Sequence, residues 1–113
     1  MESILTSIKK LLGITEEYIH FDEDLIMHIN SVFMILTQLG VGPVTGFAIE
    51  DDSATWEDYL PEATGMKLQA VKTYIYLRVR LLFDPPTSSA AMEALNRQIS
   101  EYEWRLNVVA EST

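Results

Sequence analysis

Hydrophobic residues recur at intervals of three and four along most of this chain, which is the spacing of helices that bury one face. Glycine and proline residues interrupt the pattern and divide it into four main helical segments. These segments are Glu2–Leu12, a second from Asp22 until Gly40 ends it, a third from about Glu62 to Phe83, and a fourth that begins at Ser88 or Ser89. The pattern therefore predicts an all-α protein, a small bundle of about four main helices.

Particular residues mark the expected helix ends. Gly13 follows the first helix at the position where a left-handed C-cap favours glycine. The acidic residues 22–24 are predicted to supply an N-cap and a favourable negative charge to the second helix. In the fourth helix, apolar residues continue to alternate at spacings of three and four, as in a helix that packs along other helices. This seam consists of Met92, Leu95, Ile99, Tyr102 and Leu106.

The third helix is apolar on nearly every side. Residues Val71–Pro86 read VKTYIYLRVRLLFDPP, and we place Leu82 in the packed face. Such a helix is normally buried in a protein or a bilayer, but Lys72, Arg78 and Arg80 interrupt a run that is already too short to span hydrocarbon. One small domain has difficulty covering so much apolar surface, so we expect part of it to contact another chain.

The segment between the second and third helices has a different character. Gly40–Pro61 contains three glycines, two prolines, an apolar run at Phe47 and the acidic run Glu50-Asp51-Asp52, with a short helix predicted near Ser53–Leu60. A loop of this length in a compact domain is usually functional. We expect Phe47–Leu60 to project from the helical body as a binding or channel element.

Composition narrows the class of protein. The 113 residues are enough for one domain, residues 1–113, and 48% hydrophobic with 22% charged residues is ordinary for a folded globule. The absence of cysteine excludes disulfides and thiolate zinc sites. The first residues lack the pattern of a secretory signal, and we expect a soluble intracellular protein. A net charge of −9 opposes free binding to nucleic-acid phosphates.

Two clusters of polar residues could carry chemistry, but simpler interpretations are favoured. Acidic residues at 50–52, 57 and 58 could form a catalytic carboxylate pair, which requires one desolvated carboxyl group in a shaped pocket. A solvated acidic loop is the better interpretation, and no nucleophile–base pair or phosphate-binding glycine loop accompanies it. His20, Asp22, Asp24 and His28 could hold a metal, but a helix N-cap with a solvent-facing histidine beside a helical carboxylate is the better interpretation. We predict no enzyme activity, no cofactor and no metal site.

The order of several packing motifs resembles the small head–tail connector proteins of tailed bacteriophages. The motifs are LIMHINSVFMILTQLGVGP at Leu25–Pro43, an acidic loop that contains Trp56, VKTYIYLRVRLLFDPP, and EYEWRLN at Glu101–Asn107. Their order is similar to that in members from phages and prophages of Gram-positive bacteria. The resemblance implies a mostly helical structural subunit without catalytic residues. It also implies a ring under the portal that extends the DNA channel and offers a platform for the next head-completion or tail protein. The ring would reside at the head–tail interface of the virion, after assembly in the host cytoplasm.

Candidate interface residues follow from charge and aromatic character. Arg78 and Arg80 are predicted to pair with acidic residues of a neighbouring subunit, since arginine suits carboxylates; alternatively, their stems cover the core and their heads reach solvent. Aromatic residues are better explained as core or interface residues than as base-stacking platforms, which come with a basic groove. The full set of candidates is Arg78, Arg80, Phe47, Glu50, Asp51, Asp52, Trp56 and Trp104.

The residues alone leave a second hypothesis open. A small intracellular helical adaptor or regulator that acts as a homodimer also fits the apolar helix, the long loop and the acidic charge. The two hypotheses differ in symmetry, because a heterologous contact closes into a ring and an isologous contact stops at two copies.

Overall fold

The computed structural model describes residues 2–62 and 65–111 and contains five helices within these ranges. They are α1 (Ile4–Leu11), α2 (Asp22–Gln38), α3 (Trp56–Tyr59), α4 (Gly65–Phe83) and α5 (Ser89–Glu111). The described residues form no strand, only an isolated antiparallel bridge between Ser3 and Thr55. The prediction of an all-α fold with four main helices and a long gap between the second and third is therefore confirmed; α3 is a single turn within that gap.

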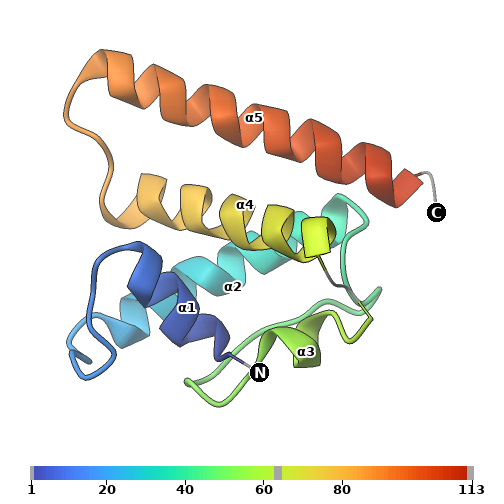
Figure 1. The fold of residues 1–113 in the computed structure, drawn as a ribbon, viewed down its shortest axis with the longest axis horizontal. Coiled ribbons are helices and arrows are strands. Elements are labelled where there is room, and N and C mark those ends of the chain that lie inside the picture. The colour runs from blue at the N-terminus through green and yellow to red at the C-terminus, as the bar shows by residue number, and fades with distance from the viewer. Residues whose placement is uncertain (1, 63–64, 112–113) are drawn as a thin grey trace.

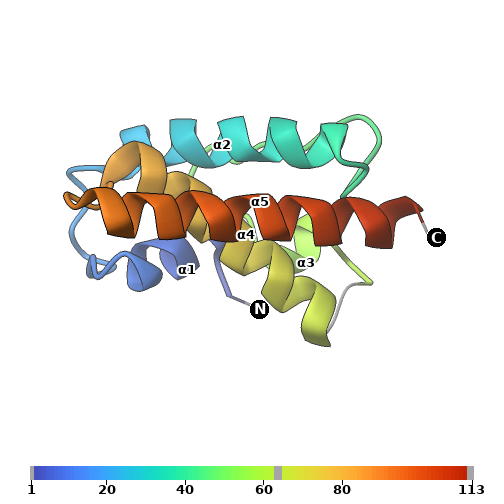
Figure 2. The same cartoon turned by 90° about the horizontal axis from the view of Figure 1, so that it is seen from above.

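Helix α4 lies at the centre of the molecule. It packs against α2 and α1 on one side and against the long α5 on the other (Figure 1). The view from above shows α5 crossing over α4, with α1 and α2 on either side of that line (Figure 2). Three helices of the same chain thus surround α4.

This arrangement explains how a helix that is apolar nearly all round is accommodated. Five residues of α4 are buried: Val71, Tyr74, Ile75, Leu77 and Val79. Helices α1, α2 and α5 of the same chain cover most of the surface that we expected one small domain to have difficulty burying. The contact between part of this helix and another chain stays a prediction. Leu82, expected in the packed face, is 54% exposed. It lies in the last turn of α4, where α4 and α5 diverge toward the loop that joins them (Figure 1).

The helix ends agree with most of the sequence predictions. Gly13 has a φ of +81° after α1, and Ser88 caps α5 by accepting a 3.1 Å hydrogen bond from the backbone N–H of Ala91. The acidic residues 22–24 occupy the first turn of α2, but the N-cap is Phe21 and no side chain caps this end. The third helix was predicted to start near Glu62. In the structure α4 begins at Gly65, and residues 63 and 64 lie outside the described ranges.

The segment from residue 40 to 61 packs onto the helical body instead of projecting from it. The ring of Phe47 lies 5.2 Å from that of Phe33 in α2 and 5.0 Å from that of Tyr59 in α3, and Ile49 is buried. The amide of Asn30 in α2 acts as a substitute peptide group: its nitrogen donates to the carbonyl of Ile49 at 3.0 Å, and its oxygen accepts from the N–H of Ile49 at 2.8 Å. The expectation of a projecting loop is corrected, because apolar side chains and these hydrogen bonds hold it in place.

The far end of the segment is fixed to the start of the chain. The N–H of Ile4 donates to the carbonyl of Ala54 at 3.0 Å, and the indole of Trp56 donates to the hydroxyl of Ser7 at 2.9 Å. A capping box at Thr55 and Asp58 begins the single turn of α3. Helix α3 thereby places Trp56 against α1 in the core.

Candidate interaction surfaces

The structure separates the predicted interface residues into buried and exposed groups. Trp56 is fully buried in the core of its own chain, so it offers no surface to a partner, and Phe47 is half-buried against Phe33. Arg78 and Arg80 are both half-buried. The exposed members are Glu50, Asp51, Asp52 and Trp104.

Arg78 already has partners within the chain. Its Nε donates to the hydroxyl of Tyr74 at 3.1 Å, and its terminal nitrogen donates to the carboxylate of Glu103 in α5. The Tyr74 hydroxyl donates to the same carboxylate oxygen at 2.7 Å. Burial together with the Glu103 contact raises the pKa of Tyr74 to about 12. Burial alone would raise the pKa of Glu103, but the hydrogen bonds from Tyr74 and Arg78 outweigh it and hold that pKa below its usual value. This network joins α4 to α5.

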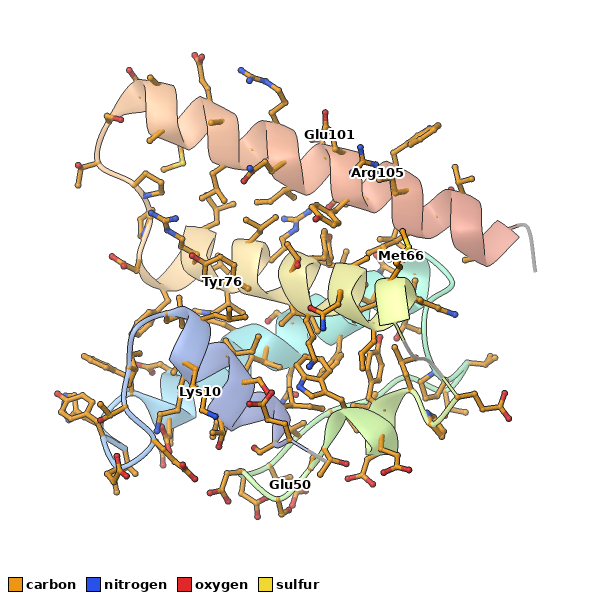
Figure 3. The ribbon with its side chains drawn as sticks, in the orientation of Figure 1. Lys10, Glu50, Met66, Tyr76, Glu101 and Arg105 are labelled. Carbon is orange, nitrogen blue, oxygen red and sulfur yellow. The ribbon has the colours of Figure 1, made fainter. Side chains whose placement is uncertain are left out.

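The acidic residues of the long segment form one exposed strip, which we call the acidic edge: Glu50, Asp51, Asp52, Glu57 and Asp58. Glu50 marks this edge, below α1 and beside α3 (Figure 3). Asp51 accepts a 2.8 Å hydrogen bond from the N–H of Ser53, and hydrogen bonds from the hydroxyl and backbone of Ser53 lower its pKa. These hydrogen bonds favour the ionised form of Asp51.

Trp104 belongs to a second exposed surface, which we call the apolar groove. It lies between the first turns of α4 and the last turns of α5, has a volume of about 370 Å³ and is lined almost entirely by apolar atoms. Its apolar residues are Met66, Ala70, Trp104, Leu106 and Val108, and Lys67 and Arg105 complete the lining. Met66 and Arg105 lie near one another at this end of the molecule (Figure 3). Of the residues in this groove, only Trp104 was predicted from the sequence as an interface candidate. Met66, which precedes the apolar run of α4, is 89% exposed.

A third surface surrounds the turn between α1 and α2. We call it the α1–α2 loop surface: Glu16, Glu17, Tyr18, Ile19, Glu23 and Asp24, all exposed. Ile19 is 72% exposed, and the ring of Tyr18, which is 49% exposed, lies beside the rings of His20 and Phe21 of the same turn. The sequence pattern predicts no main helix between Leu12 and Asp22, and the signal for this surface is a Tyr-Ile pair with acidic residues on both sides.

A buried lysine fixes the base of this turn. Lys9 of α1 is 2% exposed, and its ammonium group donates to the carbonyl of Glu16 at 2.9 Å and lies 2.9 Å from the carboxylate of Asp22. Asp22 is therefore an ion-pair partner in the structure. Among the described residues, no three His, Cys, Asp or Glu side chains converge in the way a metal site needs. His20 packs edge-on against the ring of Phe21, with ring centroids 4.9 Å apart.

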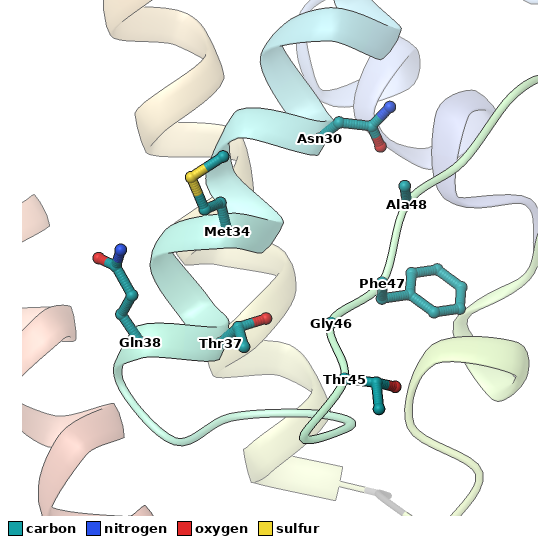
Figure 4. Close-up of a pocket in the computed structure, with 8 residues that line it drawn as sticks. All are labelled: Asn30, Met34, Thr37, Gln38, Thr45, Gly46, Phe47 and Ala48. Carbon is teal, nitrogen blue, oxygen red and sulfur yellow. The ribbon is translucent and has the colours of Figure 1, made fainter.

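A further hollow lies on the outer side of α2. Four residues of α2 and residues 45–48 of the long segment line it (Figure 4). The lining residues are Asn30, Met34, Thr37, Gln38, Thr45, Gly46, Phe47 and Ala48. None of these side chains is ionisable, so the hollow offers a candidate partner apolar contacts and neutral hydrogen-bonding groups.

Comparison with known proteins identifies the family of this chain. A family model described as phage connector protein matches residues 4–113. The chain belongs to the phage connector protein family. This family is structural and non-enzymatic, and membership implies a role at the head–tail connection and a location in the virion. No curated protein and no solved structure matches the chain. Within residues 2–62 and 65–111, no helix is both long and apolar enough to cross a membrane.

Proposed function

We propose that this protein is a head–tail connector subunit that forms a ring under the phage portal. The ring extends the DNA channel and offers a docking platform for the next head-completion or tail protein. The observation that carries this proposal is the family match across residues 4–113, nearly the whole chain. A rigid helical body with separate exposed surfaces is consistent with a subunit that has several neighbours.

Charge supports a role beside DNA rather than on it. The chain has a net charge of −9, and the acidic edge concentrates five of its carboxylates in one exposed strip. A surface of the same sign as the DNA backbone offers few phosphate contacts, so DNA can pass without being held. We therefore propose that DNA moves through the ring without sequence recognition.

The remaining interface candidates keep a place in this proposal. Arg80 forms no ion pair with a carboxylate among the described residues and is available to a neighbouring subunit or the portal. The acidic residues 50–52 and Trp104 are exposed and are proposed contacts with other virion proteins. Arg78 contributes to the packing of α4 and α5 instead.

Co-purification with the portal protein of the same phage tests the function. We expect the connector to bind the portal and to form a closed ring of single size, visible as an added layer in electron micrographs and as one mass in native mass spectrometry. An isolated species that stops at two copies and ignores the portal would support the homodimeric adaptor instead. Absence of the protein from purified virions would overturn the proposal.

A further inference from the structure

The apolar groove combines exposed apolar surface with positive charge. Met66 is 89% exposed and Trp104 is 67% exposed, an unusual degree for side chains of this size in a small domain. Lys67 and Arg105 stand beside them, and neither forms an ion pair with a carboxylate among the described residues. In a chain with only eight Lys and Arg residues, two of them flank this groove. The groove therefore favours a partner with apolar side chains between acidic ones.

The α1–α2 loop surface has that composition. Tyr18 is 49% and Ile19 is 72% exposed, and Glu16 and Glu17 come directly before them in the sequence. Residues 16–24 contain five acidic residues and no lysine or arginine. Of the five, only Asp22 has an ion-pair partner among the described residues, which is Lys9. This surface therefore complements the groove: both expose apolar side chains, and their charges are opposite.

The two surfaces lie at opposite ends of α4. The groove surrounds the first turns of this helix, whereas Phe21, which follows the α1–α2 loop, packs against Phe83 at its last residue, with ring centroids 5.1 Å apart. Seventeen positions separate Met66 from Phe83, or roughly 26 Å at a rise of 1.5 Å per residue. A rigid helix of this length keeps the surfaces apart within one chain, so they can meet only between copies (Figure 1).

We propose that the α1–α2 loop surface of one copy docks into the apolar groove of the next copy. Tyr18 and Ile19 would cover Met66 and Trp104. Glu16 and Glu17 would approach Lys67 and Arg105. Tyrosine, tryptophan and arginine are the residue types that contribute most to protein interfaces, and each is present here. Because two different surfaces meet, the contact is heterologous and repeats from copy to copy until the rotation closes a ring. The inference rests on the proposed function and assigns the subunit contact within it.

The other exposed surfaces fit the groove less well. The acidic edge has the right charge, but its large apolar neighbours Ile49 and Trp56 are buried in the chain. The outer face of α2 exposes Met34, but the residues one turn before and after it are Asn30, Ser31, Thr37 and Gln38, none of which is acidic. Only the α1–α2 loop surface offers both kinds of contact within the described ranges.

Crosslinking tests the contact directly, because the chain has no cysteine of its own. We would prepare Ile19→Cys and Met66→Cys as separate single-cysteine proteins, mix them in equal amounts and add a short bismaleimide. The expected product is a dimer that joins residue 19 of one chain to residue 66 of the other, identified by peptide mass spectrometry. Met34→Cys in place of Ile19→Cys is the matched control, since Met34 is 65% exposed but lies ten positions beyond Asp24 along α2, beside residues 45–48; it should give little product with Met66→Cys. Equal yields from both pairs would overturn the proposal.

Charge reversal adds a second test that includes a rescue. Lys67→Glu together with Arg105→Glu should reduce assembly, measured by sedimentation alone and with the portal protein. Adding Glu16→Lys and Glu17→Lys to the same chain should restore it, because opposite charges then face each other again. Arg97→Glu, which reverses another exposed arginine of α5, is the control and should leave assembly intact. Failure of the rescue, with helical circular dichroism intact in all variants, would count against the proposed contact.

The two levels of the hypothesis fail in different ways. A ring that forms on the portal without the 19–66 crosslink, and that tolerates charge reversal in the groove, would overturn this contact and leave the proposed function standing. A protein that neither self-associates nor binds the portal would overturn both.

Discussion

The α1–α2 loop and the segment between α2 and α4 are both irregular, yet they bury their large side chains to very different extents. The longer segment turns Ile49, Trp56 and Tyr59 into the core. The shorter α1–α2 loop exposes Tyr18 and Ile19. Length therefore did not decide which segment extends into solvent. The side chains and hydrogen bonds that tie each one to the helices did.

The contacts that hold the two segments against the helices differ in number and in kind. The longer segment is held by the Asn30 amide at one point, by the Phe33, Phe47 and Tyr59 rings at another, and by backbone hydrogen bonds to the chain start at a third. The α1–α2 loop is held at its base by Lys9, while near its tip Tyr18 lies beside the rings of His20 and Phe21 and local backbone hydrogen bonds join Tyr18 to Thr15 and Asp22 to Ile19. The comparison predicts that substitutions in the long segment affect folding and that those in the short loop affect association.

Trp56→Ala should have the largest effect. Removing a fully buried indole leaves a cavity and deprives the Ser7 hydroxyl of one of its hydrogen bonds, and should lower the free energy of unfolding by about 3–5 kcal/mol. Tyr18→Ala, the matched aromatic change in the short loop, should cost less than about 1 kcal/mol. Urea denaturation followed by circular dichroism measures both. Similar losses for the two variants would break the comparison.

Two glycines give the next test. Gly13 and Gly42 both have positive φ, +81° and +85°, so alanine at either should cost about 1–2 kcal/mol in backbone strain. A Cβ at Gly42 would also lie 2.6 Å from the ring of Tyr59, whereas a Cβ at Gly13 meets nothing within 4 Å. Gly42→Ala should therefore destabilise the protein by roughly 1–3 kcal/mol more than Gly13→Ala, because the Tyr59 ring must move. The melting temperatures of the two variants test this, and a lower melting temperature for Gly13→Ala than for Gly42→Ala would contradict it.

Asn30→Ala removes the side chain that pairs with Ile49. It should cost about 1–3 kcal/mol, since the N–H and carbonyl of Ile49 both lose their partner. Hydrogen exchange should show faster exchange at the amide of Ile49. Gln38→Ala, which shortens an exposed amide side chain of the same helix, serves as the control and should change neither measurement.

The smallest effect is expected at the end of α4. Leu82 is 54% exposed, so Leu82→Ala should cost less than about 1 kcal/mol. Leu77, five residues earlier in the same helix, is buried, and Leu77→Ala should cost about 2–5 kcal/mol. Melting temperatures of the isolated protein suffice to compare them. An equal loss at both positions would mean that Leu82 is covered by something beyond the single chain.

The sequence predicted the helices, the Gly13 and Ser88 caps and the seam of α5 because these depend on neighbours within one or two turns. It did not reveal that Arg78 pairs with Glu103, since 25 residues and a change of helix separate them. Nor did it reveal which apolar residues stay exposed. Periodicity identifies apolar positions, but the number of helices that surround them decides their burial. Leu82 and Met66 belong to the same helix as Val71 and differ from it only in what lies beside them.

The position of Lys9 has a consequence for the entropy of association. Its buried ammonium group closes residues 9–22 into an ordered turn through the carbonyl of Glu16 and the carboxylate of Asp22. The conformational freedom of that turn is lost when the chain folds, before any partner arrives. A neighbour that binds Tyr18 and Ile19 therefore meets a surface whose backbone is already ordered, and more of the contact energy is retained as affinity.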